Sequence, residues 1–284
     1  FEAAVQIQTA AFGRDHWRVA NNLASLGTSL DQAGEQRRAL GVFREAADIL
    51  ERIAPPENGP RLYAEQSLGQ ALTVHEQCDE GVTLMSRVTE TLANGSEEDP
   101  RLPAARWALG ICQGQLGRAD DARKTLTLAL DTIKGPAPDR AGVMLDLARV
   151  EHKLGASQQA MERLRDAVAL LADADTGAVA TVDAQLLWAK IEVDSGAQVD
   201  GLKRAGDVLA LIGKKPLAAH RQVSALVGVA EVLADAGDLR EARGIAEQAG
   251  AIVQKSKLAA TIATPTMARL RDVMRRSGGP VGAP

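Results

Sequence analysis

The sequence contains few aromatic residues, few cysteines and no long apolar run. Aromatic side chains make up only 2% of the 284 residues, although 45% of the residues are hydrophobic. The apolar content is therefore mostly alanine, leucine and valine. Such a composition favours close packing of helix on helix, whereas strands prefer aromatic and β-branched side chains. We predict an all-α chain.

The two cysteines, Cys78 and Cys112, are too few for a disulfide framework or a zinc cluster. A disulfide between them is possible, but we expect two unbonded thiols. His75 stands three residues before Cys78, yet two ligands do not make a metal site, and the pair is more typical of an exposed turn. We expect no metal and no cofactor.

Several classes of function are disfavoured by what is missing. The formal net charge of −4, from 33 basic and 37 acidic residues, argues against a general nucleic-acid binder, which needs a basic face. No apolar run approaches the roughly 20 residues that span a bilayer, so we expect a soluble, cytoplasmic segment without a membrane partner. Phosphate-loop, dinucleotide-binding and zinc-protease motifs are absent, so we expect no catalysis.

A repeated pattern of small residues is the strongest positive signal in the sequence. Between residues 21 and 46, three leucines mark one stripe of a helix, Gly27 lies beside that stripe, and Gly34 ends the helix. A second helix follows, with one small and one large apolar position. The same template recurs five more times. Its first small position is occupied by Gly27, Gly69, Gly110, Ala148, Ala189 and Ala230, at intervals of 38 to 42 residues.

Four further columns keep the same register without any insertion. Seven residues after the first column, glycine stands in five of six repeats, and Glu76 is the exception. The next column is small: Ala39, Gly81, Ala122, Ala160, Gly201 and Ala242. A column of mostly larger residues follows: Phe43, Met85, Leu126, Leu164, Ala205 and Ala246. The last is Ala46, Val88, Ala129, Ala167, Val208 and Ala249.

These columns have a physical explanation in helical hairpins. Two helices approach closely only if small side chains stand where their axes cross. We expect the larger residue of the fourth column, such as Phe43 or Leu126, to fill the gap toward the neighbouring hairpin. Unrelated alanine-rich helices would not hold five columns in register over six units.

The pattern resembles tetratricopeptide repeats, whose usual period of 34 residues is shorter than the one found here. The long period and the run Gly13-Arg14-Asp15-His16 resemble the kinesin-light-chain subtype, in which Gly-x-Asp-His-Pro precedes an asparagine-rich helix; here Trp17 replaces the proline. The resemblance implies a right-handed α-solenoid of stacked antiparallel hairpins. It covers residues 1 to about 253.

We divide the chain accordingly. Residues 1–13 are expected to form the second helix of a truncated upstream repeat, and residues 14–253 the six hairpin repeats. Residues 254–276 are expected to form a capping helix over the exposed face of the last hairpin, and residues 277–284 a flexible tail.

The first helix of each hairpin is expected to line the concave side of the stack and to bind a protein or peptide. Polar groups of the first two repeats suit an extended peptide backbone, and a later apolar strip flanked by two cations suits a hydrophobic anchor beside an acidic residue. An alternative is that these side chains only fill the interior or contact the next repeat. The candidate groove residues are Asn21, Thr28, Tyr63, Gln66, Gln70, Trp107, Ile111, Leu145, Arg149, Leu186 and Lys190.

Two functional hypotheses follow. The first is a protein-interaction scaffold without catalytic activity. The second comes from the resemblance: long-period repeats of this kind commonly follow a serine/threonine kinase domain in bacterial proteins, so the segment would be the regulatory region of a kinase whose catalytic domain lies upstream. A multidomain transcription regulator with a nucleotide-binding switch domain is a further possible host.

Overall fold

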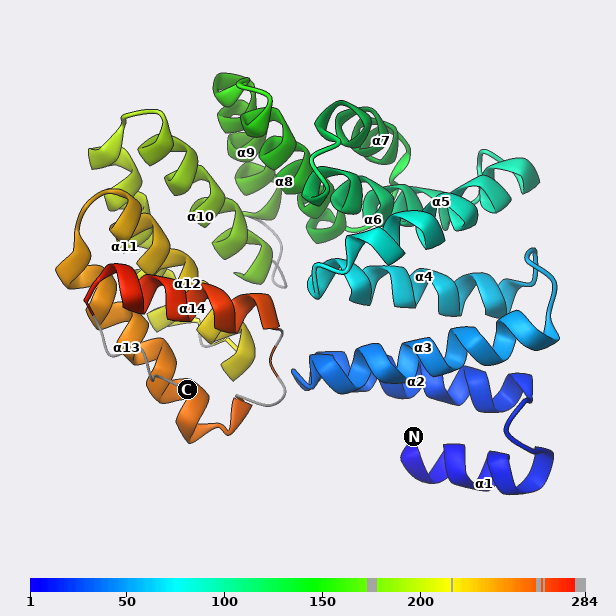
Figure 1. Cartoon of the computed structure of the whole chain (residues 1–284). Coiled ribbons are helices and arrows are strands. Elements are labelled where there is room, and N and C mark those ends of the chain that lie inside the picture. The colour runs from blue at the N-terminus through cyan, green and yellow to red at the C-terminus, as the bar shows by residue number, and fades with distance from the viewer. Residues whose placement is uncertain (173–177, 216, 259–261, 263, 279–284) are drawn as a thin grey trace. The chain divides into compact units, whose positions relative to one another are not determined.

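The structure, a computed structural model, describes residues 1–172, 178–215, 217–258, 262 and 264–278, and this part of the chain contains helices and no strand (Figure 1). The all-α prediction is confirmed. None of the described helices is long and apolar enough to cross a membrane. From residue 279 onward, the expected tail lies outside the described residues.

The helices belong to two compact units, one built on Phe1–Ile133 and the other on Lys134–Ala260 with Thr264–Pro284. The first unit contains α1 (Glu2–Phe12), α2 (Trp17–Gln32), α3 (Gln36–Ile53), α4 (Gly59–Val74), α5 (Cys78–Gly95), α6 (Leu102–Gln115) and α7 (Ala119–Thr132). The second contains α8 (Ala137–Lys153), α9 (Ser157–Leu171), α10 (Ala178–Asp194), α11 (Gln198–Lys214), α12 (Ala219–Asp235), α13 (Leu239–Lys255) and α14 (Thr264–Arg276).

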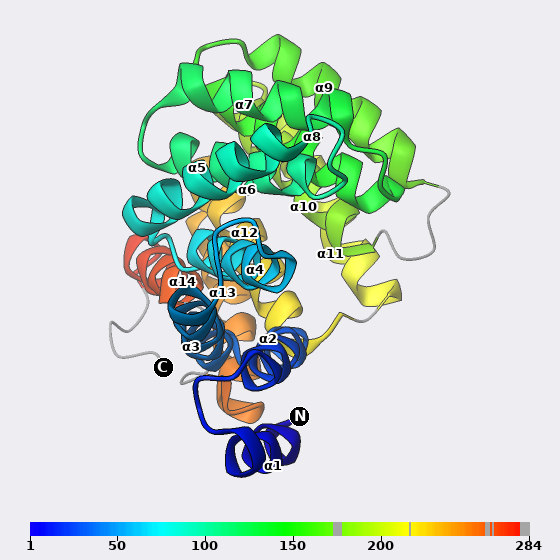
Figure 2. The same ribbon diagram turned by 90° about the vertical axis from the view of Figure 1, so that its right-hand side faces the viewer.

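The first unit is a stack of three hairpins, α2–α3, α4–α5 and α6–α7, preceded by α1, which packs on α2. The first helices α2, α4 and α6 pack side by side, so they form one layer of the unit. Figure 2 looks along several of these helices and shows α3 and α5 to one side of that layer. This arrangement gives the unit an inner layer of first helices and an outer layer of second helices.

The second unit repeats this arrangement with the hairpins α8–α9, α10–α11 and α12–α13. Its first helices again form a row, in which α8 packs on α10 and α10 packs on α12. Helix α14 packs against both α12 and α13, which is the position that the first helix of a further hairpin would take. Its apolar side chains Met267, Leu270, Val273 and Met274 are all buried.

The turn inside each hairpin shows why glycine recurs seven residues after the first small column. Five of these glycines have a left-handed backbone, with φ between 78° and 89°: Gly34, Gly117, Gly155, Gly196 and Gly237. Side chains other than glycine rarely adopt this conformation because Cβ approaches the following carbonyl oxygen. Glu76 occupies the same turn in the second hairpin with φ of 55°. The backbone geometry is thus retained where the residue type is not.

The first three hairpins show how the two helices of a hairpin meet in the core. In each of them the small residue of the first helix is glycine, and the residue opposite on the second helix is large. A Cβ at Gly27 would lie 2.6 Å from Cε1 of Phe43, and one at Gly110 would lie 2.6 Å from Cγ of Leu126. A Cβ at Gly69 would lie 2.0 Å from Sδ of Met85. The large side chain therefore fills the space that the missing Cβ leaves within its own hairpin.

The same large residues also reach the neighbouring hairpin, as the sequence predicts. Phe43 is only 6% exposed and belongs to a buried cluster that includes Leu68 and Leu72 of α4. One side chain thus joins its own hairpin to the next. Through Phe43, the apolar core of one hairpin continues into the core of the next.

Two hairpins of the second unit carry a buried ion pair between their helices. Glu151 on α8 is 2% exposed and accepts hydrogen bonds from Nε and Nη2 of Arg163 on α9, at 2.9 and 2.6 Å. Glu192 on α10 makes the equivalent pair with Arg204 on α11, at 2.9 and 2.7 Å. Such bidentate pairs fix the register of one helix against the other.

The turn geometry predicts that Glu76→Gly stabilises the first unit by about 1 kcal/mol, because glycine adopts the left-handed conformation without the Cβ penalty. Gly117→Ala is the matched reverse change and should destabilise by a similar amount. Urea unfolding followed by circular dichroism measures both. Equal stability of Glu76→Gly and the parent chain would contradict this explanation of the turn.

The glycine–leucine contact predicts a non-additive pair of substitutions. Gly110→Ala should destabilise by about 1–3 kcal/mol because its Cβ overlaps Leu126. Leu126→Ala should destabilise by about 2–5 kcal/mol because it leaves a cavity. The double variant should be less destabilised than the sum of the two, since each change relieves the defect of the other. Strict additivity in a urea double-mutant cycle would show that the two residues do not pack together.

Candidate functional site

In the first unit, the predicted groove residues lie on the adjacent first helices α2, α4 and α6. Asn21 on α2 and Gln70 on α4 are exposed, and Tyr63 on α4 is 48% exposed. Trp107 and Ile111 on α6 are half-buried, one helical turn apart. Polar and aromatic side chains therefore reach the surface from neighbouring helices of one layer.

Two of the predicted polar residues already have intramolecular partners. The hydroxyl of Thr28 donates to the carbonyl oxygen of Ala24 at 3.2 Å, within its own helix. The side-chain Nε2 of Gln66 donates to the carbonyl oxygen of Arg101 at 3.4 Å. A ligand that used these two side chains would have to replace the intramolecular bonds, whereas no such bond is made by the side chains of Asn21 and Gln70 among the contacts described.

In the second unit, the structure corrects the predicted apolar strip. Leu145 is only 6% exposed and belongs to a buried cluster with Leu164 and Leu187, so it is a core residue and not a surface residue. Leu186 is half-buried and packs on α12, where a Cβ at Gly228 would lie 2.8 Å from its Cδ1. Both leucines thus serve the packing of hairpins.

The prediction that Leu145 and Leu186 form a surface strip is wrong for one geometric reason. Gln66, Trp107, Leu145 and Leu186 all stand three residues before the first small column, and all are buried or half-buried. The equivalent Val227 is fully buried. One position after that column the residue is exposed in three hairpins, at Gln70, Arg149 and Lys190, and half-buried in the other three, at Thr28, Ile111 and Glu231. The earlier position therefore lies toward a neighbouring helix, and the later position lies on the open face.

The two predicted cations of the second unit are exposed but paired. Arg149 forms an ion pair with Asp146, three residues earlier on α8. The Nζ of Lys190 on α10 lies 2.8 Å from Oδ2 of Asp235 on α12 and 3.6 Å from Oδ1 of Asp194. An acidic ligand at either cation would compete with a carboxylate of this chain.

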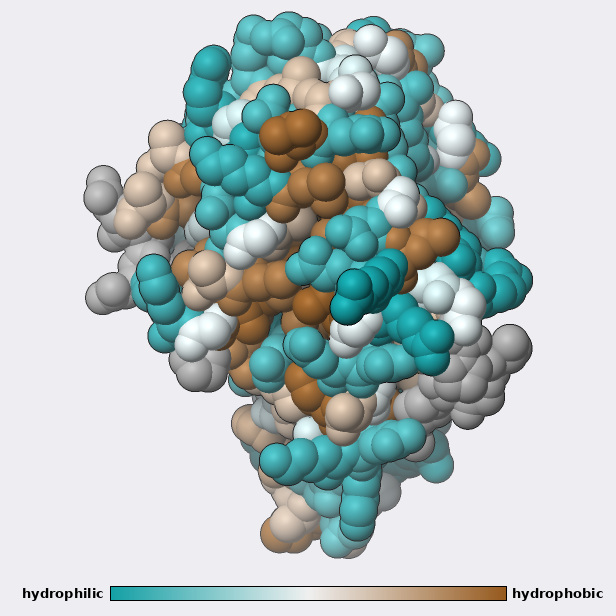
Figure 3. All heavy atoms as spheres, turned by 90° about the vertical axis from the view of Figure 1, so that its left-hand side faces the viewer, coloured by the Kyte–Doolittle hydropathy of each residue, from teal (hydrophilic) through white to brown (hydrophobic). Residues whose placement is uncertain are grey.

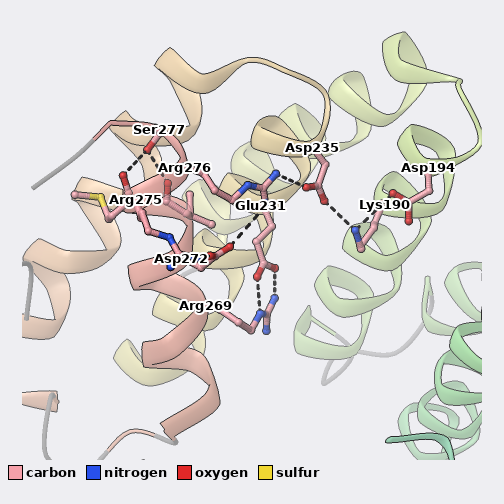
Figure 4. Close-up of polar contacts among 11 residues, drawn as sticks. Lys190, Asp194, Glu231, Asp235, Arg269, Asp272, Arg275, Arg276 and Ser277 are labelled. Carbon is pink, nitrogen blue, oxygen red and sulfur yellow. Dashed lines mark hydrogen bonds and ion pairs between the residues drawn. The ribbon is translucent and has the colours of Figure 1, made fainter. Parts of the chain in front are cut away.

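Lys190 belongs to a ladder of polar contacts, ion pairs and a histidine–carboxylate contact, that the sequence analysis missed (Figure 4). His152 Nε2 on α8 lies 3.1 Å from Asp194 Oδ2 on α10, and Arg276 Nη2 on α14 lies 2.6 Å from Asp235 Oδ1. The contacts His152–Asp194, Lys190–Asp235 and Asp235–Arg276 join residues 42, 45 and 41 positions apart. These separations are close to the repeat interval, and opposite charges at that interval could have revealed the ladder.

A second contact joins α14 to the same face of α12. Arg269 on α14 makes a two-pronged ion pair with Glu231, in which Nε lies 2.7 Å from Oε1 (Figure 4). Helix α14 thus packs through one stripe of buried apolar side chains, and Arg269 and Arg276 form ion pairs with carboxylates of α12.

The electrostatic balance of the ladder favours the charged forms. Burial alone would raise the pKa of Asp235, but hydrogen bonds from Lys190 and Arg276 outweigh it, and the pKa is lowered. Burial alone would lower the pKa of Lys190, but its pairing with Asp235 and Asp194 outweighs that effect, and the pKa is raised. Lys190, Asp235 and Arg276 therefore stabilise one another's charged forms.

Apolar side chains also reach the surface away from the first helices. Val199 at the start of α11 is 80% exposed, and Leu239 at the start of α13 is 44% exposed. Figure 3 shows one face of the chain, on which hydrophobic residues form a broken band among polar ones. Exposed apolar area is therefore not restricted to the predicted groove residues.

The cysteines differ from their expected state. Cys78 on α5 and Cys112 on α6 are joined in a disulfide, with their Cα atoms 4.8 Å apart, so the expectation of two unbonded thiols is wrong. The ring of His75 contacts the carbonyl oxygen of Gln36, with Nε2 at 3.2 Å. No group of three or more potential metal ligands occurs among the described residues.

The ladder predicts a pH-dependent contribution of Asp235 to stability. Asp235→Asn should lower the free energy of unfolding of the second unit by about 1 kcal/mol at pH 7, a modest value because Lys190 and Arg276 are more than a third exposed. A lowered carboxyl pKa stabilises the fold above the unfolded value of about 3.9, and this stabilisation is lost as the pH falls through the folded pKa.

The difference between Asp235→Asn and the parent chain should therefore shrink as the pH falls below the unfolded pKa of about 3.9. Asp207→Asn, an exposed position on α11 outside the ladder, is the control and should show no such pH dependence. Thermal unfolding across this pH range measures both. A constant difference from pH 7 to pH 3 would contradict the role of the Asp235 charge.

Comparison with known proteins shows the fold. No family model and no curated protein match the sequence. Among solved structures, a Rap protein complexed with competence and sporulation factor superposes with a TM-score of 0.63 at 11% identity, over 92% of this chain and 76% of that one. A putative kinesin light chain of Podosopora anserina with TPR-like repeats gives 0.55 at 20% identity, over 71% and 99%.

A thermophilic TPR protein of Thermus thermophilus gives a TM-score of 0.52 at 20% identity, over 75% of this chain and 98% of that one. At these identities the likeness concerns the fold alone. The chain has a fold of the tetratricopeptide type, as the spacing of its small residues predicts.

Proposed function

We propose that this chain is a protein-interaction module that binds a protein or peptide on the open faces of its first helices. The observation that carries the proposal is the row of adjacent first helices in each unit, with exposed polar, aromatic and charged side chains at equivalent positions. A rigid row of helices presents such groups at fixed spacing, which favours recognition of an extended partner.

The first unit provides groups suited to a peptide. The exposed amides of Asn21 and Gln70 can donate to and accept from a peptide backbone. Tyr63 adds a half-exposed ring with a hydroxyl, a side chain that is enriched at the centres of protein interfaces. An extended peptide with a hydrophobic residue that packs on Tyr63 fits this surface.

The second unit provides Arg149 and Lys190, which would favour an acidic residue in the ligand. Because both cations are paired with carboxylates of the chain, binding there requires an exchange of ion-pair partners. We therefore infer a weak, salt-dependent electrostatic contribution to affinity and a stronger contribution from the first unit. The Rap structure, solved in complex with competence and sporulation factor, supports a role in binding for this type of fold.

The test is a peptide array in which each peptide carries one large hydrophobic residue next to aspartate or glutamate. Tyr63→Ala should weaken binding of selected peptides about tenfold or more, as expected for a hot-spot residue. Leu128→Ala is the matched control, because Leu128 is 51% exposed on the outer helix α7 of the same unit. An equal effect of the two substitutions, or none, would contradict binding at the first helices.

The same peptide array tests the contribution of the second unit to binding. Arg149→Glu should reduce binding of acidic peptides at low salt and have little effect at high salt, whereas Arg165→Glu on the outer helix α9 should have little effect at either. Loss of acidic-peptide binding in both variants would indicate a general charge effect.

We infer a second candidate role, in which the segment is the regulatory region of a bacterial serine/threonine kinase. Its support is the resemblance of the long repeat interval to regions that follow such kinases. The sequence encoded before Phe1 tests this role directly. A kinase lysine and a catalytic-loop aspartate there would support it, and their absence would exclude it.

A further inference from the structure

The junction between the second and third hairpins is the one place where the described chain is covalently cross-linked. Cys78 is the first residue of α5, in the second hairpin, and Cys112 lies in α6, in the third. Both are buried, at 2% and 0% exposure, and their separation of 34 residues places them in different repeats. The bridge therefore links neighbouring hairpins and not the two helices of one hairpin.

A glycine provides the space for this bridge. Gly81 stands at the column that is alanine in four of the six hairpins, one turn after Cys78. A Cβ at Gly81 would lie 2.7 Å from Sγ of Cys112. Alanine at this position would displace Cys112 from Cys78. The missing side chain thus allows the two sulfur atoms to meet.

The surroundings also suit the reduced state. Oε1 of Gln115 lies 2.9 Å from Sγ of Cys78, so a thiol at Cys78 has a hydrogen-bond acceptor in place. The Nε2 of the same side chain donates to the carbonyl oxygen of Thr73 at 3.3 Å, which orients the amide. Reduction would therefore leave the Cys78 thiol with a partner at this junction.

We propose that Cys78 and Cys112 form a reversible, redox-controlled lock between the second and third hairpins. In the oxidised state the bridge fixes the start of α5 to α6. In the reduced state the two hairpins are held by packing alone, and the first unit is less stable. The lock adds a response to thiol–disulfide conditions that the proposed binding function does not require.

The chemistry is thiol–disulfide exchange with a low-molecular-weight disulfide such as oxidised glutathione. The thiolate of one cysteine attacks a glutathione sulfur and displaces one glutathione thiolate. The second cysteine, as thiolate, then attacks the mixed disulfide and displaces the other glutathione. The two protons of the cysteine thiols pass to the two displaced glutathione thiolates, and the two electrons from the cysteines reduce the glutathione disulfide. Because both sulfurs are buried, exchange requires opening of the first turn of α5.

The experiment equilibrates the whole chain in oxidised or reduced glutathione, blocks free thiols with N-ethylmaleimide in denaturant, and measures intact mass. The oxidised sample should take up no maleimide and the reduced sample two. Returning the oxidised sample to reduced glutathione should restore two reactive thiols. Two reactive thiols after oxidation, or a bridge that resists reduction, would overturn the proposal.

Thermal unfolding then measures how much the disulfide stabilises the first unit. The disulfide closes a loop between residues 34 positions apart. It should therefore raise the unfolding temperature of the first unit by about 10 °C over the reduced state. Cys112→Ala should unfold at the same temperature in both buffers, and its helical circular dichroism checks that it folds. An unchanged unfolding temperature on oxidation of the parent chain would overturn the proposal.

Two further variants test the space at Gly81. Gly81→Ala keeps both cysteines but should form the bridge to a much smaller extent in oxidised glutathione, because its Cβ displaces Cys112. Gly41→Ala, at a helical glycine with no atom within 4 Å of the added Cβ, is the matched control and should oxidise fully. Equal oxidation of the two variants would contradict the role of Gly81.

Discussion

The close approach of the two helices within each hairpin is the constraint on which the structure depends. In the first three hairpins, the first helix provides a glycine, and the second helix provides the volume that fills the space. Where the first residue is glycine, its partner is Phe43, Met85 or Leu126. In the last two hairpins alanine stands in both columns, as in Ala189 with Ala205. A tightly packed interior requires the side chains on the two helices to match in this way.

Stacking of hairpins decides which residues remain available for binding. A first helix has one stripe toward its own partner, one toward each neighbouring first helix, and one open stripe. Leu145 and Leu186 lie on the stripes used for packing, whereas Tyr63, Gln70 and Arg149 lie on the open stripe. A binding surface on the open stripe, as proposed here, would be mainly polar, with its apolar contribution from single side chains. This explains why affinity should depend on a few residues such as Tyr63.

Charges reinforce the second unit in two different ways. Within hairpins, Glu151–Arg163 and Glu192–Arg204 are largely removed from water and fix register. Between hairpins, the ladder that includes Lys190 and Asp235 is partly exposed and extends to α14. Because each interior member has partners on both sides, the ladder neutralises charges that would otherwise be free to bind a ligand. Under the proposed function, stability and ligand recognition would therefore compete for the same cations.

The sequence by itself determined the helical class, the hairpin repeat and the left-handed turns, because these follow from local chemistry: small residues at a fixed interval and glycine at a C-cap. It also placed Tyr63, Gln70 and Arg149 on an exposed face. Only the tertiary structure decided that Leu145 is core, that Lys190 is neutralised by Asp235, and that Cys78 meets Cys112. Each of these depends on residues from different hairpins, about one repeat apart, and periodicity within one helix does not reveal which neighbour a side chain will contact.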